Sequence, residues 1–349
     1  MKVVVDAMGS DSAPGPEVAG AIRAVRSLPL EVELVGDAAS LEAELARAGR
    51  TPADRISIVH ASEVVTTHDH PAQAFRAKPD SSMRIAVARV ADGQGDAVVS
   101  AGNSGAMLAC AMFGMGRLPG IERPAIVTVL PTPSGPLVLC DAGANTEPKA
   151  SQLAQFGILA AAYDRVVHGR ERPRLGLLSN GAEPGKGTPL TREAHELLKR
   201  LTGNFQYVGY IEGSDLFRGV VDAIATDGFT GNVVLKTCEG IAEGLFGLVL
   251  QELELRSSEA QDGNARAMLE RTPLARLGTS LVTPALRSVA KRIDYTEIGG
   301  ALLAGVNHPA VIAHGRSDAN AISSAIRAAS HFAERKLPDA LATALAALS

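Results

Sequence analysis

Short apolar runs alternate with helical patterns along most of the chain. Nine runs of four to seven residues are rich in β-branched side chains and bounded by turn residues, as expected for largely buried strands. They are residues 2–6, 31–35, 55–59, 96–100, 125–130, 136–140, 174–178, 220–226 and 310–313. Most are followed by apolar residues at helical spacing, several opened by Pro or Ser and closed by Gly. This alternation predicts an α/β fold with a mostly parallel sheet and helices on both faces.

The chain is long enough to bury a large core, with 349 residues of which 46% are apolar. It contains no fixed repeat and no low-complexity linker, so we expect one α/β domain over residues 1–349. The exception lies at about 250–292, where helical patterns follow one another without a strand. Residues 256–292 carry seven Lys and Arg against three Asp and Glu, in a chain of net charge −4. We expect a helical outgrowth with a basic surface.

Composition excludes some classes of protein. The chain has a net charge of −4, no Trp and 3% aromatic residues, so we do not expect it to bind nucleic acid. Cys110, Cys140 and Cys238 lie far apart in apolar surroundings, which predicts reduced core thiols in the cytoplasm. The first residues enter a strand without signal-peptide features, and no apolar run is long enough to span a membrane. We therefore expect a cytoplasmic protein.

The loops that follow the predicted strands are rich in Gly, Asp and Asn. In parallel α/β sheets, ligands bind at the carboxyl ends of the strands, so these loops are the candidates for chemistry. They are residues 6–14, 60–71, 100–106, 141–145, 179–188, 226–232 and 314–318. Their polar side chains Asp6, Asp11, Asp141 and Asn145 are candidates for contacts to a substrate.

The stretch SAGNSGA leaves a buried strand and enters a helix. Its backbone N–H groups, from Gly102, Asn103, Ser104 and Gly105, would form an anion site at the start of that helix. A tight turn with Ser104 as the helix N-cap explains the stretch taken alone slightly better. Ala106 stands where a nucleophile elbow requires Gly, so Ser104 is not expected to be a covalent nucleophile.

The stretch SNGAEPGKGT places Lys186 between two glycines. Only three residues separate Gly181 from Gly185, and Gly187 follows the Lys, so this is not a Walker A motif. The glycines would let the backbone approach a ligand while Lys186 supplies a positive charge. A flexible loop with a solvated Lys explains the stretch equally well.

Two further loops leave alternatives open. TDGFTGN brings Asp227 and Asn232 to one turn at the start of a long apolar helix, where helix capping accounts for Asp227 better than for Asn232. His60 follows a strand directly, and a structural and a catalytic role are equally supported.

Neither a metal nor a dinucleotide is indicated. The sequence His68, Asp69, His70 has no third or fourth ligand at recognisable spacing, so a solvated loop is expected there. No G-x-G-x-x-G follows any strand, which removes the main support for a nicotinamide-dependent oxidoreductase.

Taken together and in order, these loops resemble the bacterial phosphate acyltransferases of phospholipid synthesis, the PlsX family. The resemblance covers essentially the whole chain. It rests on VDAMGSDSAP, IVHASEVV, KPDSSM, SAGNSGA, DAGAN, GKGT, IEGSD, TDGFTGNVVLKTCEG, DYTEIGGALLAG and AHGRSDANA. Ser10 and Ser104 stand where the family usually has Gly and Thr, changes that leave the turn and its hydroxyl chemistry possible.

The resemblance implies a fold and an activity. The fold is a three-layer α/β/α sandwich similar to that of isocitrate and isopropylmalate dehydrogenases and of phosphotransacetylase. The activity is synthesis of acyl phosphate from acyl-acyl carrier protein and inorganic phosphate, without a cofactor or metal, by a homodimer at the membrane surface. The matching catalytic positions are His60, Lys186, Asp227 and Asn232.

For that reaction we expect phosphate to attack the thioester directly. The N–H groups of Gly102–Gly105 and the Lys186 ammonium would bind phosphate, and Asn232 or His60 would donate to the developing oxyanion. Asp227 would orient Lys186 or His60. The basic outgrowth would contact anionic lipid or the acidic carrier protein, or simply pack on the body or a second copy.

Two other functions stay open. A phosphotransacetylase that uses a short acyl-CoA shares the fold and the product. A non-catalytic membrane scaffold that binds a carrier protein would explain the basic helices but not the Gly, Asp and Asn loops.

Overall fold

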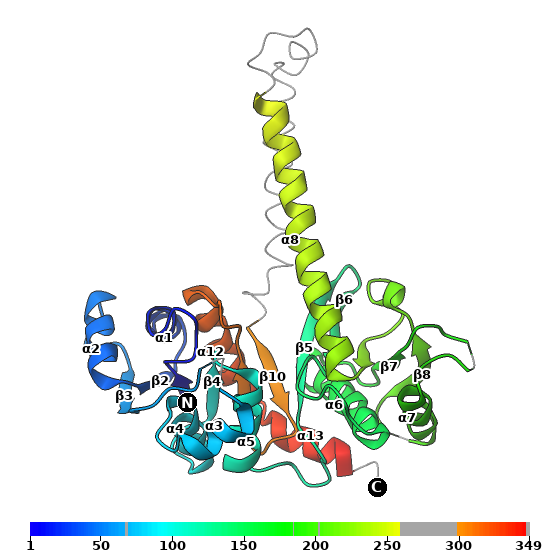
Figure 1. Cartoon of the computed structure of the whole chain (residues 1–349), viewed down its shortest axis with the longest axis horizontal. Coiled ribbons are helices and arrows are strands. Elements are labelled where there is room, and N and C mark those ends of the chain that lie inside the picture. The colour runs from blue at the N-terminus through cyan, green and yellow to red at the C-terminus, as the bar shows by residue number, and fades with distance from the viewer. Residues whose placement is uncertain (67–68, 184, 202, 259–298, 347–349) are drawn as a thin grey trace.

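One eleven-stranded sheet runs through the whole protein (Figure 1). The computed structural model describes residues 1–349 except 67–68, 184, 202, 259–298 and 347–349. Its strands are β1 (Lys2–Asp6), β2 (Glu31–Gly36), β3 (Ile56–His60), β4 (Ala97–Ser100), β5 (Ala125–Thr132), β6 (Gly135–Cys140), β7 (Arg174–Leu178), β8 (Gln206–Ile211), β9 (Ala223–Ala225), β10 (Ala301–Ala304) and β11 (Ala310–Ile312).

The helices pack on both faces of this sheet. They are α1 (Gly15–Ser27), α2 (Ala38–Arg47), α3 (Pro71–Ala77), α4 (Ser82–Ala91), α5 (Ser104–Gly114), α6 (Ala150–His168), α7 (Pro189–Arg200), α8 (Gly228–Ser258), α12 (Ala319–Glu334) and α13 (Leu337–Ala346), with a short 3₁₀ turn at Gly213–Asp215.

Alternate residues of each strand face opposite layers, as the strand period requires. Val3 and Val5 of β1 belong to a core shared with α1, α2, α6, α7, α12 and α13, which cover one face of the sheet. Val4 belongs to a second core with α3, α4 and α5 on the other face. A third, smaller core lies under the base of α8, where Leu235 packs. The predicted three-layer α/β/α sandwich is confirmed.

The sheet consists of two parallel blocks that run in opposite directions. The strand order is β3-β2-β1-β4-β11-β10-β5-β6-β9-β7-β8. Seven of the ten described pairings are parallel, whereas β10 is antiparallel to both of its neighbours and β5 and β6 form an antiparallel hairpin. These three reversals separate the first block, β3 to β11, from the second, β6 to β8. The sheet is mostly parallel, as predicted. The register brings the carboxyl ends of both blocks to one row across the sheet, since Val99 pairs with Val311 in the first block and Cys140 with Ala225 in the second, and Leu302 and Val127 link the two pairs.

All nine predicted strands are present, with boundaries shifted by up to three residues. Two strands were not predicted. β8 lies at the edge of the sheet and is partly exposed, and β10 has only four residues and follows two glycines.

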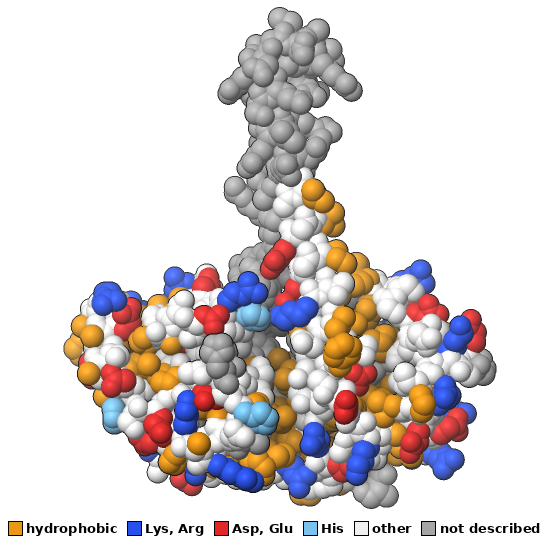
Figure 2. Space-filling view, in the orientation of Figure 1, with side chains coloured by type: hydrophobic (Ala, Val, Ile, Leu, Met, Phe, Trp, Pro, Cys, Tyr) orange, Lys and Arg blue, Asp and Glu red, His pale blue; other side chains and the backbone are white. Residues whose placement is uncertain are grey.

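Helix α8 leaves the second block after β9 and projects well beyond the body of the protein (Figure 1). It presents large apolar side chains to solvent, which form an orange stripe along the rod in Figure 2. The exposed members are Phe229, Val233, Ile241, Leu245 and Leu248. Of the outgrowth predicted at about 250–292, residues 250–258 continue α8, and the basic part from 259 onward lies outside the described residues.

Two kinds of feature are absent from the part of the chain that the structure describes. None of the helices there is both long and apolar enough to cross a bilayer. No cluster of three or more His, Cys, Asp and Glu in the same part of the chain could hold a metal ion.

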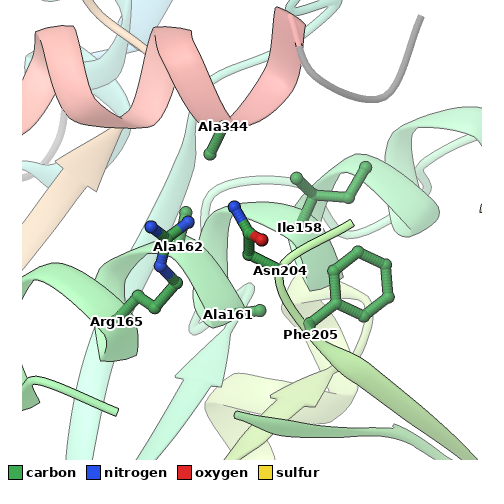
Figure 3. A pocket seen from close by; sticks show the side chains of 7 residues that line it. All are labelled: Ile158, Ala161, Ala162, Arg165, Asn204, Phe205 and Ala344. Carbon is green, nitrogen blue, oxygen red and sulfur yellow. The ribbon is translucent and has the colours of Figure 1, made fainter. Parts of the chain in front are cut away.

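A small cavity lies between α6, α13 and the segment before β8 (Figure 3). Its volume is about 20 Å³, and Ile158, Phe205 and three alanines supply most of its wall. A space of that size holds about one water molecule, so it cannot accept an organic substrate.

Candidate active site

The loop that follows β6 is built around the carboxylate of Asp141. This side chain is fully buried, and its Oδ1 accepts hydrogen bonds from the backbone N–H groups of Ile126, Gly143 and Ala144 at 3.0, 3.1 and 3.0 Å. Its Oδ2 accepts from the Asn145 backbone at 2.7 Å. Burial raises the pKa of Asp141, and these hydrogen bonds oppose that rise. Asp141 therefore shapes the loop rather than facing a ligand.

Asn145 completes the same structure. Its amide Nδ2 donates to the Pro124 carbonyl and to Asp141 Oδ2, both at 2.9 Å. Its Oδ1 lies 3.4 Å from Nη1 of the exposed Arg123. Two of the residues predicted to contact substrate thus hold the DAGAN loop in shape.

The start of α8 interlocks with this loop. The N–H of Gly228 donates to the Asn145 carbonyl at 2.7 Å, and a Cβ at Gly231 would overlap the Asp141 carbonyl oxygen. Only glycine permits this approach. Gly143 has a φ of 142°, and a Cβ there would lie 3.6 Å from Cβ of Asn232. The exposed amide of Asn232 is therefore held beside the DAGAN loop.

Asp227 caps the first turn of α8. Its Oδ1 accepts from the Thr230 N–H and its Oδ2 from the Thr230 hydroxyl, both at 2.8 Å. These contacts match the capping alternative. They connect Asp227 to neither Lys186 nor His60.

An open depression of about 510 Å³ lies between the beginnings of α7 and α8. Thr188, whose hydroxyl accepts from the Thr191 N–H at 3.2 Å, caps α7 at one side. The wall contains two carboxylates and three hydroxyls beside apolar side chains. Its residues are Thr146, Glu147, Pro148, Thr188, Leu190, Asp227, Phe229 and Thr230.

The loop that carries Lys186 follows β7, which pairs with β9. Its second glycine, Gly187, is fixed at both backbone polar atoms, since the N–H donates to Asn180 Oδ1 at 2.9 Å and the carbonyl accepts from Arg192 Nη1 at 2.6 Å. Gly185 and Gly187 have φ of 93° and 85°, which favour glycine. Lys186 is exposed, and its loop stands beside the one that leads into α8.

The anion turn predicted at residues 102–105 belongs to the first block. Asn103, not Ser104, is the N-cap of α5, because its Oδ1 accepts from the Ala106 N–H at 3.0 Å and Ser104 is the first helical residue. Behind the turn, the Ser100 hydroxyl donates to the buried Asp6 at 2.7 Å, and burial raises the pKa of Asp6. The SAGN capping prediction is thus corrected by one residue, and Asp6 is structural.

The loop after β11 joins this turn. The Ala313 N–H donates to the Ser100 carbonyl at 2.9 Å, and the Asp11 N–H donates to the Gly315 carbonyl at 2.8 Å. Burial lowers the pKa of His314, and the positive charge of Lys236 on α8 lowers it further. Helix α8 therefore passes close to the loops of the first block. The surface is hollowed between the two halves beside the base of this helix (Figure 2).

His60 stands apart from the other predicted catalytic residues. It ends β3, the edge strand of the first block, and its Nδ1 accepts from the Ala38 N–H at 3.3 Å. Eight strand spacings, about 38 Å along the sheet, separate β3 from β9, which leads to Asp227 and Asn232. The structure brings Lys186, Asp227 and Asn232 to neighbouring loops of one block and leaves His60 out.

The loop at 314–318 carries an exposed cation, Arg316, that was not among the predicted site residues. The N–H of Arg316 donates to His314 Nδ1 at 3.2 Å, which places this cation in the group of loops around Ser100. Its position shortly after a buried strand was the available signal.

Comparison with known proteins identifies the family. A model of the family described as fatty acid synthesis protein matches residues 1–339. The chain is 45% identical over 339 residues to a phosphate acyltransferase of Syntrophotalea carbinolica, covering 97% of this chain and 92% of that one. It is 46% identical over 342 residues to a phosphate acyltransferase of Geobacter sulfurreducens, covering 98% and 93%. The chain belongs to the phosphate acyltransferase family.

Members of the phosphate acyltransferase family transfer acyl groups to phosphate, and this chain is such an enzyme. Solved structures agree at the level of the fold. A phosphotransacetylase from Streptococcus pyogenes has a TM-score of 0.63 at 19% identity, covering 96% of this chain and 94% of that one. The EutD phosphotransacetylase from Staphylococcus aureus has a TM-score of 0.57 at 14% identity, covering 100% and 94%.

Proposed function

We propose that this enzyme transfers a long-chain acyl group from acyl carrier protein to inorganic phosphate, and so supplies acyl phosphate for membrane phospholipid synthesis. One observation carries the proposal: the interlocked DAGAN and TDGFTGN loops hold the exposed Asn232 in the first turns of α8, which follows β9, and β9 pairs with β7, whose loop carries Lys186. A cation and an amide donor on neighbouring rigid loops suit a reaction between an anion and a carbonyl group.

The reaction requires little of the protein beyond holding phosphate and the thioester in position. A phosphate oxygen forms a bond to the thioester carbon, the C–S bond breaks, and the sulfur leaves with the bonding electrons as a thiolate. A thiol of pKa about 8.5 leaves readily, so no covalent enzyme intermediate is required. Burial raises the pKa of Cys110 to about 12 and that of Cys140 well above its usual range, so neither thiol supplies a nucleophile.

We assign Lys186 to phosphate and the Asn232 amide to the oxyanion that develops at the carbonyl oxygen when phosphate attacks the carbonyl carbon. Asp227 and Thr230 hold the first turn of α8, which carries Asn232. We assign the turn at Gly102–Gly105 to the opposite wall of the hollow at the base of α8, where its N–H groups face phosphate across the two blocks. His60 has no part in this site within one chain.

The depression beside Asp227 suits the phosphopantetheine arm of a carrier protein. Glu147 and Asp227 repel an anion, whereas the hydroxyls of Thr146, Thr188 and Thr230 can pair with the amide groups of the arm. A depression of about 510 Å³ is large enough for such an arm. This supports a thioester on a pantetheine arm, which acyl carrier protein and coenzyme A share.

We further propose that the enzyme is a cytoplasmic homodimer in peripheral contact with anionic membrane. The support is the apolar stripe on α8. Ile241 and Leu248 in this stripe are 62% and 64% exposed, and contiguous exposed apolar side chains mark a surface that contacts a protein or a membrane.

A phosphotransacetylase acting on a short acyl-CoA is the second candidate, favoured by the fold of the solved structures. Acyl phosphate formation, trapped with hydroxylamine, separates the two. We expect product from palmitoyl-acyl carrier protein and inorganic phosphate with EDTA present, and none from acetyl-CoA. Product from acetyl-CoA and none from the carrier substrate would show that the enzyme is a phosphotransacetylase.

A further inference from the structure

The aliphatic stem of Lys186 lies across Gly181, five residues earlier in the same loop. A Cβ built on Gly181 would lie 2.8 Å from Cγ and 3.0 Å from Cδ of Lys186, and 2.8 Å from Oε2 of Glu183. Carbon atoms in contact are ordinarily 3.5–4.0 Å apart. The Lys186 stem therefore occupies the space that a side chain at position 181 would fill.

The backbone around Lys186 offers little freedom to move away. Gly187 is bonded at its N–H by Asn180 and at its carbonyl by Arg192. The Lys186 N–H donates to the Glu183 carbonyl at 3.2 Å. Because these contacts fix the chain on both sides, the direction of the Lys186 side chain depends on the room over Gly181.

We propose that Gly181 is a positioning residue for Lys186: its lack of a side chain sets the orientation of the ammonium that receives inorganic phosphate. The inference rests on the proposed function, in which Lys186 binds phosphate. It gives a reason for the glycine that stands four residues before the first glycine of the GKG turn. Gly181 does not have a positive φ, so its backbone conformation does not demand glycine.

Gly181→Ala tests the inference without disturbing the fold. The added methyl meets side-chain atoms alone, the stem of Lys186 and the carboxylate of Glu183, so these side chains move rather than the backbone. We expect a three- to tenfold loss in kcat/KM for phosphate, an unchanged KM for the acyl thioester, and an unchanged melting temperature. Gly213→Ala is the matched control, since a Cβ there meets nothing within 4 Å and its φ is not positive. It should behave as the wild type.

A double-mutant cycle shows whether Gly181 acts through Lys186. In a Lys186→Ala background, Gly181→Ala should have no further effect on kcat/KM for phosphate. An equal loss in both backgrounds, or wild-type kinetics of Gly181→Ala, overturns the inference.

The dissociation constant of inorganic phosphate, measured by titration calorimetry, gives the same comparison without turnover. We expect it to rise three- to tenfold in Gly181→Ala and to stay unchanged in Gly213→Ala. A wild-type enzyme that forms no acyl phosphate would refute the proposed function. An active wild-type enzyme whose phosphate affinity is unaffected by Gly181→Ala would refute the positioning role alone.

Discussion

Lys186 is the residue whose charge the proposed reaction uses most directly. In Lys186→Ala, one charged hydrogen bond to phosphate of roughly 1.5–3 kcal/mol is lost, which corresponds to a decrease in kcat/KM for phosphate of about tenfold or more. The KM for the thioester should change little, because the depression beside Asp227 is lined by other residues. Steady-state assays with phosphate as the varied substrate measure this, and an unchanged dependence of rate on phosphate would remove Lys186 from the site.

Glu17 determines part of the pH dependence of stability. It is fully buried in the first turn of α1 and accepts from the Ser10 N–H at 3.1 Å. Burial raises its pKa from 4.5 to about 7, and the charge of Asp6 contributes in the same direction. The folded protein therefore binds a proton more tightly than the unfolded chain does. Stability contributed by that proton is complete below pH 4.5 and is lost as the pH rises to about 7.

Glu17→Gln should remove this dependence, because an amide keeps the neutral form at every pH. Relative to the variant, the wild type should lose on the order of 3 kcal/mol of unfolding free energy between about pH 5 and pH 8. Urea unfolding at the two pH values measures the difference. Parallel stability curves for the two proteins would show that Glu17 does not titrate in this range.

The junction between α8 and the DAGAN loop holds the site together at the level of elements. In Gly231→Ala, the new Cβ would overlap the Asp141 carbonyl oxygen, so backbone must shift. We expect a loss of about 3 kcal/mol in the free energy of unfolding, together with lower activity. Gly240→Ala on the same helix meets open space and should be neutral or stabilise by up to about 1 kcal/mol. Equal stabilities of the two variants, measured by chemical denaturation, would contradict the interlock.

Helices and strands with a clear local pattern were predictable from the sequence. Whether a given strand runs parallel or antiparallel to its neighbours was not. An apolar run such as 125–130 identifies a strand, but the hairpin of β5 and β6 and the insertion of β10 depend on pairing between distant segments. β8 was missed because its positive-φ Gly209 and partial exposure interrupt the apolar pattern.

The same limit applies to the site. The glycine-rich loops could be recognised by composition, and neighbouring strands β7 and β9 do bring Lys186 and Asp227 to adjacent loops. The reversals at β10 and β5 could not be predicted from the sequence, and the register across them brings the carboxyl ends of both blocks to one row. The distance of His60 from the Lys186 loop could not be predicted from the sequence, since only the strand order places β3 at the far edge.

For the whole molecule, the apolar stripe on α8 is the main surface at which we expect a binding partner. If a second copy covers it, Leu245→Glu places a charge in an apolar interface and should weaken association at least tenfold. Glu243→Gln, an exposed position on the same helix, should leave association unchanged. Sedimentation equilibrium of both variants measures this. A Leu245→Glu protein that associates like the wild type would place the dimer interface elsewhere.

The order of strands also determines when the sheet can be completed during synthesis of the chain. β10 and β11, residues 301–312, separate β4 from β5, although the latter two are close in sequence. Until residues 301–312 leave the ribosome, each half of the sheet ends in an unpaired strand, and such edges template aggregation. The chain is therefore most prone to aggregate when it is almost complete but the two halves of its sheet are not yet paired through β10 and β11.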